Sequence, residues 1–365
     1  MTGRSQYLWR GAAVACSVAL GMTTLSAQSA PAAKSRTTAA AKSAATGTAD
    51  NGSWKLERTP DGHPDMQGVW ANNTVTPLER PEVWKDKKTL SEADIKELQA
   101  VAAQIYENDG DAQFGEDLIR AILQKITKPG SYDPGTGNYN QFWIVGRDWH
   151  DRRTSLLTDP ADGKLPPMVP AAKARRDKDR EMRKAHAFED PEIFPTGERC
   201  VNFGVPRIGA GYNSYFSIVQ SANYVTVMAE MAHDARVIPT DGRPHAPKAI
   251  RNWNGDSRGH WEGDTLVIDT TNFSPKSDFM GSRENLHLIE KFTRVSKDIL
   301  NWEITVDDPS TCTKPWTMMI PLARKDELIY EYACHEANES MEGMLKGHRY
   351  EEKQKSSSTT TNGSR

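Results

Sequence analysis

The feature that most constrains the fold is a series of short alternating segments, joined by tight turns, in the second half of the chain. The clearest of them, residues 299–306, alternates large apolar residues with polar ones, which is the period of a strand with one buried face. Turn residues separate the segments into three expected hairpins, whose arms are residues 215–220 with 224–231, 286–295 with 299–306, and 316–322 with 328–334. Short strands at this spacing favour an antiparallel sheet that is closed or folded upon itself. We therefore predict a mainly β body at residues 200–352, either a calycin-like barrel of about eight strands or a sandwich.

The part of the chain before this body, residues 54–199, mixes helical and extended patterns. Ser91 is a candidate helix cap with Asp94 three residues later, and the apolar residues that follow recur on one face. Residues 117–126 continue in helical period, and residues 171–186 are so highly charged that they suit a solvent-exposed or a mobile helix. We expect the N-terminal helices to pack against the outside of the β body or across one of its mouths.

The first 30 residues have the pattern of a secretory signal peptide. Two arginines precede an apolar run at residues 11–25, and small residues follow, which predicts cleavage between Ala27 and Ala30. The apolar run of about 15 residues is shorter than the roughly 20 that span a bilayer, so a membrane anchor is the weaker alternative. Lipidation at Cys16 is another alternative. We expect a secreted or periplasmic protein with no membrane attachment after cleavage.

Two further segments lack the apolar residues that a packed core needs. Residues 31–53 are rich in Ala, Ser, Thr and Lys, and residues 353–365 contain an unbroken run of hydroxyl residues. Such segments cannot bury enough surface to offset the entropy lost on ordering. We expect residues 31–53 to be a flexible linker and residues 353–365 to be a disordered tail.

Signal cleavage leaves three cysteines in an oxidising compartment, enough for one disulfide and one free thiol. If a turn at residues 324–327 joins the last two expected strands, Cys334 lies opposite about Thr317 and not opposite Cys312. We therefore prefer a disulfide between Cys200 and Cys334, with a catalytic cysteine as the less favoured alternative.

Composition and motifs exclude several kinds of partner and cofactor. The formal net charge is -3, whereas a nucleic-acid surface needs a basic excess. The sequence has no Gly-x-x-x-x-Gly-Lys, Cys-x-x-Cys or His-Glu-x-x-His motif, so nucleotide-binding, thioredoxin-like and zincin functions lose support. We expect no cofactor and no nucleic-acid partner, and a small molecule as ligand or substrate.

Residues 251–273 contain the densest group of polar and aromatic side chains in the chain. Gly and Asp at positions 255–256 and 263–264 are best explained as turn makers. His260, Glu262 and Asp269 then remain as candidate catalytic residues. Asp269 shares a strand face with Val267, so it points into the interior if Val267 does.

Three more candidates for acid and base catalysis, His233, His287 and Glu290, come from other expected strands. Glu290 shares a strand face with two apolar residues, and an apolar interior would raise the pKa of its carboxyl group. The alternatives are structural: Glu290 is the buried partner of Arg236 or Arg294, and His233 binds a backbone carbonyl at a strand end.

The spacing of histidines and carboxylates does not support a metal site. From residue 233 onward we consider four close pairs of a histidine and a carboxylate: His233 with Asp234, His260 with Glu262, His287 with Glu290, and His335 with Glu336. Only an even offset places two side chains on one face of a strand, and only His260 and Glu262 meet that condition. We therefore assign no metal ligands.

Large aromatic side chains supply candidates for ligand binding, because their flat faces stack on sugar or aromatic rings. Among them we select Trp253, Trp261 and Tyr215, together with Arg236. The alternative is that most of the large aromatic residues belong to the core.

Three runs are distinctive: HDAR at residues 233–236, GDSRGHWEGDTLV at residues 255–267, and EYACHE at residues 331–336. They resemble an uncharacterised family of exported bacterial proteins of the Acidobacteria and Proteobacteria type. The resemblance covers most of residues 61–352. It implies export and a common fold, and it implies no activity.

Three functions are consistent with these patterns. The first is an exported protein that binds a small organic or carbohydrate ligand in a β-barrel pocket. The second is a hydrolase or lyase on the same scaffold that uses His and Glu side chains on a glycoside or phenolic substrate. The third, a structural envelope protein, is the least favoured, because so many His and carboxylate side chains fall at expected strand ends.

Overall fold

The computed structural model describes residues 54–107, 112–113, 115–130, 144, 146–336 and 338–362. The chain divides into two units, and the described residues all belong to the second one, residues 49–365. The expected signal peptide, residues 1–30, and the expected linker, residues 31–53, lie outside the described residues. All elements named below belong to the second unit.

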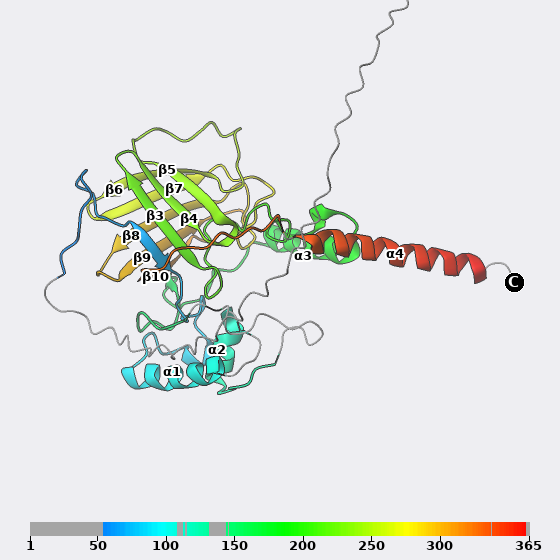
Figure 1. Ribbon diagram of the computed structural model, residues 1–365, viewed down its shortest axis with the longest axis horizontal. Coiled ribbons are helices and arrows are strands. Elements are labelled where there is room, and N and C mark those ends of the chain that lie inside the picture. Colours follow the sequence, from blue (N-terminus) through cyan, green and yellow to red (C-terminus); the bar gives the residue numbers. More distant parts are fainter. Residues whose placement is uncertain are drawn as a thin grey trace, which may run out of the picture. The chain divides into compact units, whose positions relative to one another are not determined.

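An antiparallel sheet dominates the fold, with nine strands that lie side by side (Figure 1). Its order is β5, β4, β3, β1, β10, β9, β8, β7 and β6, and a short tenth strand, β2, pairs with β10 beside this path. The strands are β1 Gly68–Ala71, β2 Leu157–Asp159, β3 Tyr215–Ser221, β4 Tyr224–Ala229, β5 Asp234–Pro239, β6 Asp256–Glu262, β7 Thr265–Thr271, β8 His287–Arg294, β9 Ile299–Asp307 and β10 Trp316–Lys325.

The sheet curls until its two edge strands, β5 and β6, approach one another. Gly259 of β6 lies at this seam, where an added Cβ atom would be 3.1 Å from a methyl group of Ile238 and 2.9 Å from one of Thr240. Only the smallest residue allows so close an approach. The nearly closed barrel-like sheet confirms the predicted fold class and selects the barrel over the sandwich.

The barrel interior is filled from strands with strict alternation of buried and partly exposed residues. In β8 and β9 every second side chain is buried, among them Leu288, Phe292, Trp302 and Ile304. This follows directly from the period of two in the sequence. The same alternation corrects one expectation, because Leu266, Ile268 and Thr270 face the interior of β7 while Asp269 lies on its outer face.

Two of the three expected hairpins are confirmed, as β3 with β4 and β8 with β9. The third is wrong: β10 continues to Lys325, and residues 328–334 form no strand, with Leu328 and Tyr330 largely exposed. The edge of β10 is taken instead by β1, which pairs Trp70 with Arg324 and comes from the N-terminal part of the chain. The sheet therefore crosses the expected boundary between residues 54–199 and 200–352.

The helices outside the barrel follow their sequence signals. Ser91 and Asp94 cap α1 reciprocally, because each backbone N–H binds the other side chain, at 2.7 and 3.2 Å. Helices α1 and α2 share a second, smaller core with Val75, Leu90 and Trp149. The α-helices are α1 Glu92–Glu107, α2 Gly115–Leu123, α3 Pro170–Ala185 and α4 Glu339–Asn362, and the short 3-10 helices are η1 Glu82–Trp84, η3 Pro191–Ile193 and η4 Met231–His233.

The last segment of the chain, residues 353–365, is the one for which we expected a disordered tail. Residues 353–362 continue helix α4, and residues 363–365 lie outside the described part of the chain. Ion pairs one turn apart, Lys346 with Glu342 and His348 with Glu352, support the preceding turns of this helix. None of the described helices is long and apolar enough to cross a membrane.

Candidate functional site

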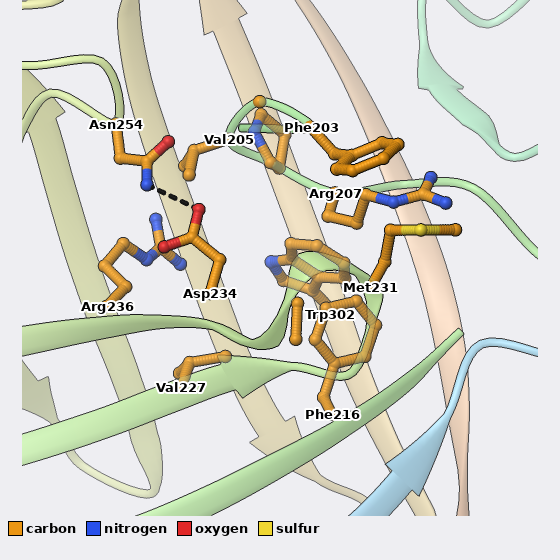
Figure 2. A pocket seen from close by; sticks show the side chains of 13 residues that line it. Phe203, Val205, Arg207, Phe216, Val227, Met231, Asp234, Arg236, Asn254 and Trp302 are labelled. Carbon is orange, nitrogen blue, oxygen red and sulfur yellow. Dashed lines mark hydrogen bonds between the residues drawn. The ribbon is translucent and has the colours of Figure 1, made fainter. Parts of the chain in front are cut away.

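A pocket opens into the barrel at the end where β3 and β5 begin and β4 ends (Figure 2). Strand residues form its walls, and the loop at residues 203–207 covers it. The residues that line it are Phe203, Gly204, Val205, Pro206, Arg207, Phe216, Val227, Ala229, Met231, Asp234, Arg236, Asn254 and Trp302.

An ion pair lies at the inner wall of this pocket. Glu290 of β8 is completely buried and accepts hydrogen bonds from both terminal nitrogens of Arg236 on β5, one of them at 2.9 Å. The indole nitrogen of Trp302 donates a third bond to the same carboxylate at 3.0 Å. A buried charge needs partners of this kind because it has lost its hydration shell. Glu290 is therefore the buried partner of Arg236, which was the structural alternative to a catalytic role.

A polar chain reaches the pocket from three different segments. Asp234 begins β5 and shares the face of Arg236, because the two residues are separated by an even offset. Asn254 donates a hydrogen bond to Asp234 at 2.8 Å and accepts one from Asn202 at 3.0 Å. Asn202 is buried and lies beside the covering loop. These hydrogen bonds therefore connect the loop to strand β5.

Aromatic rings form the opposite side of the pocket. The ring of Phe216 meets Trp302 edge to face, with centroids 5.4 Å apart, and Phe292 stacks behind Trp302 at 5.5 Å. Figure 2 shows Asp234, Arg236 and Asn254 together on one side, apart from Phe216 and Trp302. The pocket thus offers hydrogen bonds on one side and a flat apolar surface on the other.

The covering loop is anchored at one end by a disulfide. The structure joins Cys200 to Cys334, the pair that we preferred, and leaves the thiol of Cys312 free. The ring of Phe203 packs edge-on against Tyr332, with centroids 6.0 Å apart. With the cover in this position, the free volume of the pocket is about 30 Å³, which is room for about two water molecules.

Arg207, at the end of the covering loop, is the one other charged side chain in the lining. Burial lowers the pKa of its guanidinium group, an effect that nearby Tyr332 partly opposes. Its carbon chain lines the pocket, whereas the guanidinium group points away from Asp234 and Arg236 (Figure 2).

A separate cluster of imidazoles and carboxylates lies on the outer face of strands β6 to β8. The carboxylate of Asp269 is hydrogen-bonded to His287 at 2.7 Å and to His245 at 2.9 Å. The other ring nitrogen of His245 lies 3.0 Å from Asp256, which also pairs with Arg258 at 2.7 Å. Together these contacts hold the loop that carries His245 against the barrel wall.

The pKa values in this outer cluster shift in opposite directions. The hydrogen bond to Asp269 raises the pKa of His287, against the opposing effect of burial. Burial by itself would raise the pKa of Asp269, but hydrogen bonds and charge interactions with His287 and His245 outweigh it, so the pKa of Asp269 is lowered. The charged forms of both partners are therefore favoured.

The candidate catalytic residues do not meet in one site. Glu290 lies inside the barrel, Asp269 and His287 lie on its outer face, and His233 is exposed at the end of η4. Glu262 is exposed as well and pairs with His260 at 3.2 Å. The even offset between His260 and Glu262 correctly predicted that their side chains share one strand face. An offset within one strand could not show which face of each strand is turned toward the barrel interior.

The selected aromatic residues lie outside the pocket, and only Arg236 among the candidate ligand-binding residues lines it. Trp261 stacks on His63 with centroids 4.7 Å apart. The hydroxyl of Tyr215 donates a hydrogen bond to Glu327 at 3.1 Å, and burial, reinforced by Glu327, raises the pKa of that phenol. Trp253 is partly buried, and its backbone carbonyl accepts a hydrogen bond from Ser277.

Four residues that matter in these arrangements were not among the candidates. Asp234 could have been found, because it stands two positions before Arg236 and must share its face in a strand. Asn254 and His245 come from the long connection between β5 and β6, and no local pattern shows where such a connection returns to the barrel. Asp256, interpreted as a turn maker, instead binds His245 and the backbone N–H of Ala246.

Within the described ranges, no group of three or more His, Cys, Asp or Glu side chains is placed to hold a metal ion. No family model, no curated protein and no solved structure matches the chain.

Proposed function

We propose that the protein is an exported binding protein that holds a small, neutral, ring-bearing molecule, either a carbohydrate or a simple organic compound, in the pocket at the barrel end. The observation that carries this proposal is the division of the pocket into a hydrogen-bonding side, Asp234, Asn254 and Arg236, and an aromatic side, Phe216 and Trp302. Sugar rings and hydroxylated aromatic rings present this combination of polar edges and apolar faces.

The charges in the pocket favour a neutral ligand. Glu290 neutralises Arg236 through two hydrogen bonds. Asp234 accepts a hydrogen bond from Asn254 and keeps a second carboxylate oxygen for a ligand hydroxyl. An anionic ligand would have to approach Asp234. Arg207, which forms no ion pair with a carboxylate among the described residues, points its guanidinium group elsewhere.

Binding requires the cover to move. A free volume of about 30 Å³ is far below the roughly 300 Å³ of a typical small-molecule site. Residues 203–207 are the segment that would open, because they form a loop outside the strands. Opening would release the packing of Val205 against the barrel core, whereas the hydrogen bond from Asn202 and the Cys200–Cys334 disulfide hold the segment that precedes the loop. The disulfide would keep the opened loop close to the barrel.

Export is part of the proposal. It is supported by the signal-peptide pattern of residues 1–30, by the resemblance to exported bacterial proteins, and by a disulfide, which persists in oxidising compartments. Acid and base catalysis on a glycoside or phenolic has no comparable support, because Glu290, His287 and His233 face three different surroundings.

The proposal is tested by calorimetric titration of the purified chain with glucose, cellobiose and p-nitrophenyl β-glucoside. The last compound carries both a sugar ring and an aromatic ring. We expect saturable binding of at least one compound, weakened about tenfold by Asp234→Ala, which removes one charge-assisted hydrogen bond. Asp241→Ala is the matched control, since Asp241 lies just beyond the same strand and outside the pocket.

Two results would count against the proposal. One is the absence of binding to all three compounds, and the other is binding that Asp234→Ala leaves unchanged. Release of coloured p-nitrophenol by the wild type, retained in Asp241→Ala, would replace the binding function with the hydrolase alternative.

A further inference from the structure

We propose that a second pocket, which lies between helix α3 and the barrel, binds an organic anion with an apolar body, such as an aromatic or aliphatic carboxylate or sulfonate. This pocket shares no lining residue with the first one, so the inference is independent of the function proposed above. Its residues are Leu165, Pro166, Met168, Ala172, Arg175, Arg176, Asp179, Arg183, Asp278, Phe279, Met280, Gly281, Ser282, Arg283, Cys312 and Trp316.

The second pocket already has the size of a ligand site. Its volume is about 500 Å³, within the range of about 300 to 1,000 Å³ that small-molecule sites occupy. The buried rings of Phe279 and Trp316 stack at 6.5 Å and form an apolar floor together with Leu165 and Met168. A ligand with an apolar body would cover these rings without displacing any part of the chain.

One face of α3 supplies the positive charge. Arg175, Arg176 and Arg183 line the pocket from helical positions that lie on the same side. Among the described residues, none of these three arginines forms an ion pair with a carboxylate. A helix that presents three uncompensated guanidinium groups to a cavity offers bidentate donors suited to a carboxylate or sulfonate.

Arg175 is held in position for this role. Its Nη2 donates to the carbonyl of Gly281 at 3.0 Å and to the hydroxyl of Thr311 at 3.2 Å. Both acceptors are neutral, so the positive charge is kept. The remaining N–H groups of Arg175 have no protein acceptor within the described part of the chain, so they are free to bind a ligand.

The carboxylates around the pocket do not cancel this charge. Asp179 and Asp278 both face Arg283, at 2.6 and 3.6 Å. Four arginines against two aspartates leave an excess of two positive charges in the lining. Asp308 lies behind the wall, where its carboxylate accepts hydrogen bonds from Ser310 and Thr311.

Helix α3 spans the cavity and does not fill it. Ala172 is its one buried residue in the described structure, and the helix is held mainly by polar contacts. These include the ion pair between Asp179 and Arg283 and the hydrogen bond from Val169 N–H to the carbonyl of Thr311. A helix fixed by polar contacts at its edges leaves a cavity between itself and the apolar floor.

The free thiol of Cys312 provides a reporter inside this pocket. Burial raises the pKa of the thiol, with a further contribution from Asp308, so it reacts slowly as the neutral form at pH 7. A bound ligand would shield it further. Its alkylation by iodoacetamide, an uncharged reagent, therefore measures occupancy of the pocket.

The test uses the fluorescent anion 1-anilinonaphthalene-8-sulfonate and its uncharged parent, 1-anilinonaphthalene, on the purified chain. We expect saturable binding of the sulfonate, at least tenfold tighter than that of the parent compound, and slower alkylation of Cys312 when the sulfonate is bound. The double variant Arg176→Gln with Arg183→Gln should weaken sulfonate binding at least tenfold, because two charged donors are lost.

The matched control is Lys178→Gln with Lys184→Gln, which removes the same charge from α3 at exposed positions outside the pocket. Both doubly substituted proteins should keep the wild-type melting temperature, since all four side chains are exposed. Equal binding of the sulfonate and the parent compound, equal weakening in the two variants, or unprotected Cys312 would overturn the proposal. Asp234→Ala should leave sulfonate binding unchanged, which separates this result from the test of the first pocket.

Discussion

At the scale of single residues, the buried pair of Arg236 and Glu290 is the interaction on which the barrel interior depends most. Each charge is acceptable inside the barrel only because the other is present. The pair also neutralises the inner wall of the first pocket. We therefore expect loss of the Arg236–Glu290 pair to lower the stability of the protein before it changes ligand binding.

Glu290→Gln should lower the free energy of unfolding by about 3 to 5 kcal/mol, because it leaves a buried guanidinium group without its counter-charge. Urea denaturation of the purified protein measures this change. The double variant Glu290→Gln with Arg236→Met should recover part of the loss, since it removes the uncompensated charge. A loss below about 1 kcal/mol in the single variant would show that Glu290 is not the buried partner described here.

The outer cluster of Asp269 and His287 should make stability depend on pH. The pKa of His287 is raised by folding, so its contribution is complete below its unfolded value of 6.5 and disappears as the pH rises through the folded value. The pKa of Asp269 is lowered, so its contribution is present above 3.8 and disappears as the pH falls through the folded value. Both contributions are therefore present together between these two limits.

We expect His287→Asn to destabilise the protein most at about pH 5.5, and by about 1 kcal/mol or less, because both partners are one-third exposed and screened by solvent. The difference from wild type should shrink by pH 8.5. Urea denaturation at the two pH values measures it. A difference that grows toward pH 8.5 would contradict the assigned direction of the shift.

At the scale of elements, closure of the barrel depends on the seam between β5 and β6. Gly259→Val would place two methyl groups against Ile238 and Thr240, and overpacking of this kind costs about 1 to 3 kcal/mol. His260→Val is the control, because His260 follows Gly259 in the same strand and is exposed. Thermal unfolding should show a lower melting temperature for the first variant only, and equal values for both would argue against a tight seam.

The elements also show how far the sequence could predict the fold. Alternation and turn residues were sufficient for the hairpins β3–β4 and β8–β9, where the partner strand is the next segment in the chain. They failed for β10, whose second partner, β1, lies about 250 residues earlier in the chain. A four-residue strand that pairs over such a distance carries too little local pattern to be assigned.

At the scale of the whole molecule, the same limit applies to the site. The offset between Asp234 and Arg236 was readable in the sequence, and so was the apolar face that carries Glu290. Asn254, the covering loop at residues 203–207 and the arginine face of α3 come together only through tertiary packing. The sequence therefore predicted the scaffold and, of the residues that line the first pocket, only Arg236. It missed the parts that are brought in by connections.

The two pockets lie at the same end of the barrel and differ in charge. One is balanced by the Arg236–Glu290 pair, and the other keeps an excess of arginine. Separate ligands are therefore expected, a neutral ring in the barrel and an organic anion beneath α3. The first of these ligands is the main proposal: a neutral ring binds between Asp234 and Trp302.

The measurement that tests this claim most directly is NMR of the tryptophan indole N–H groups during titration with cellobiose and p-nitrophenyl β-glucoside. The indole of Trp302 lines the pocket and donates to Glu290, so we predict that its resonance shifts saturably with one of these compounds. The resonances of Trp84 and Trp149, in the second core, should stay in place. A Trp302 resonance that does not move with either compound would contradict the account.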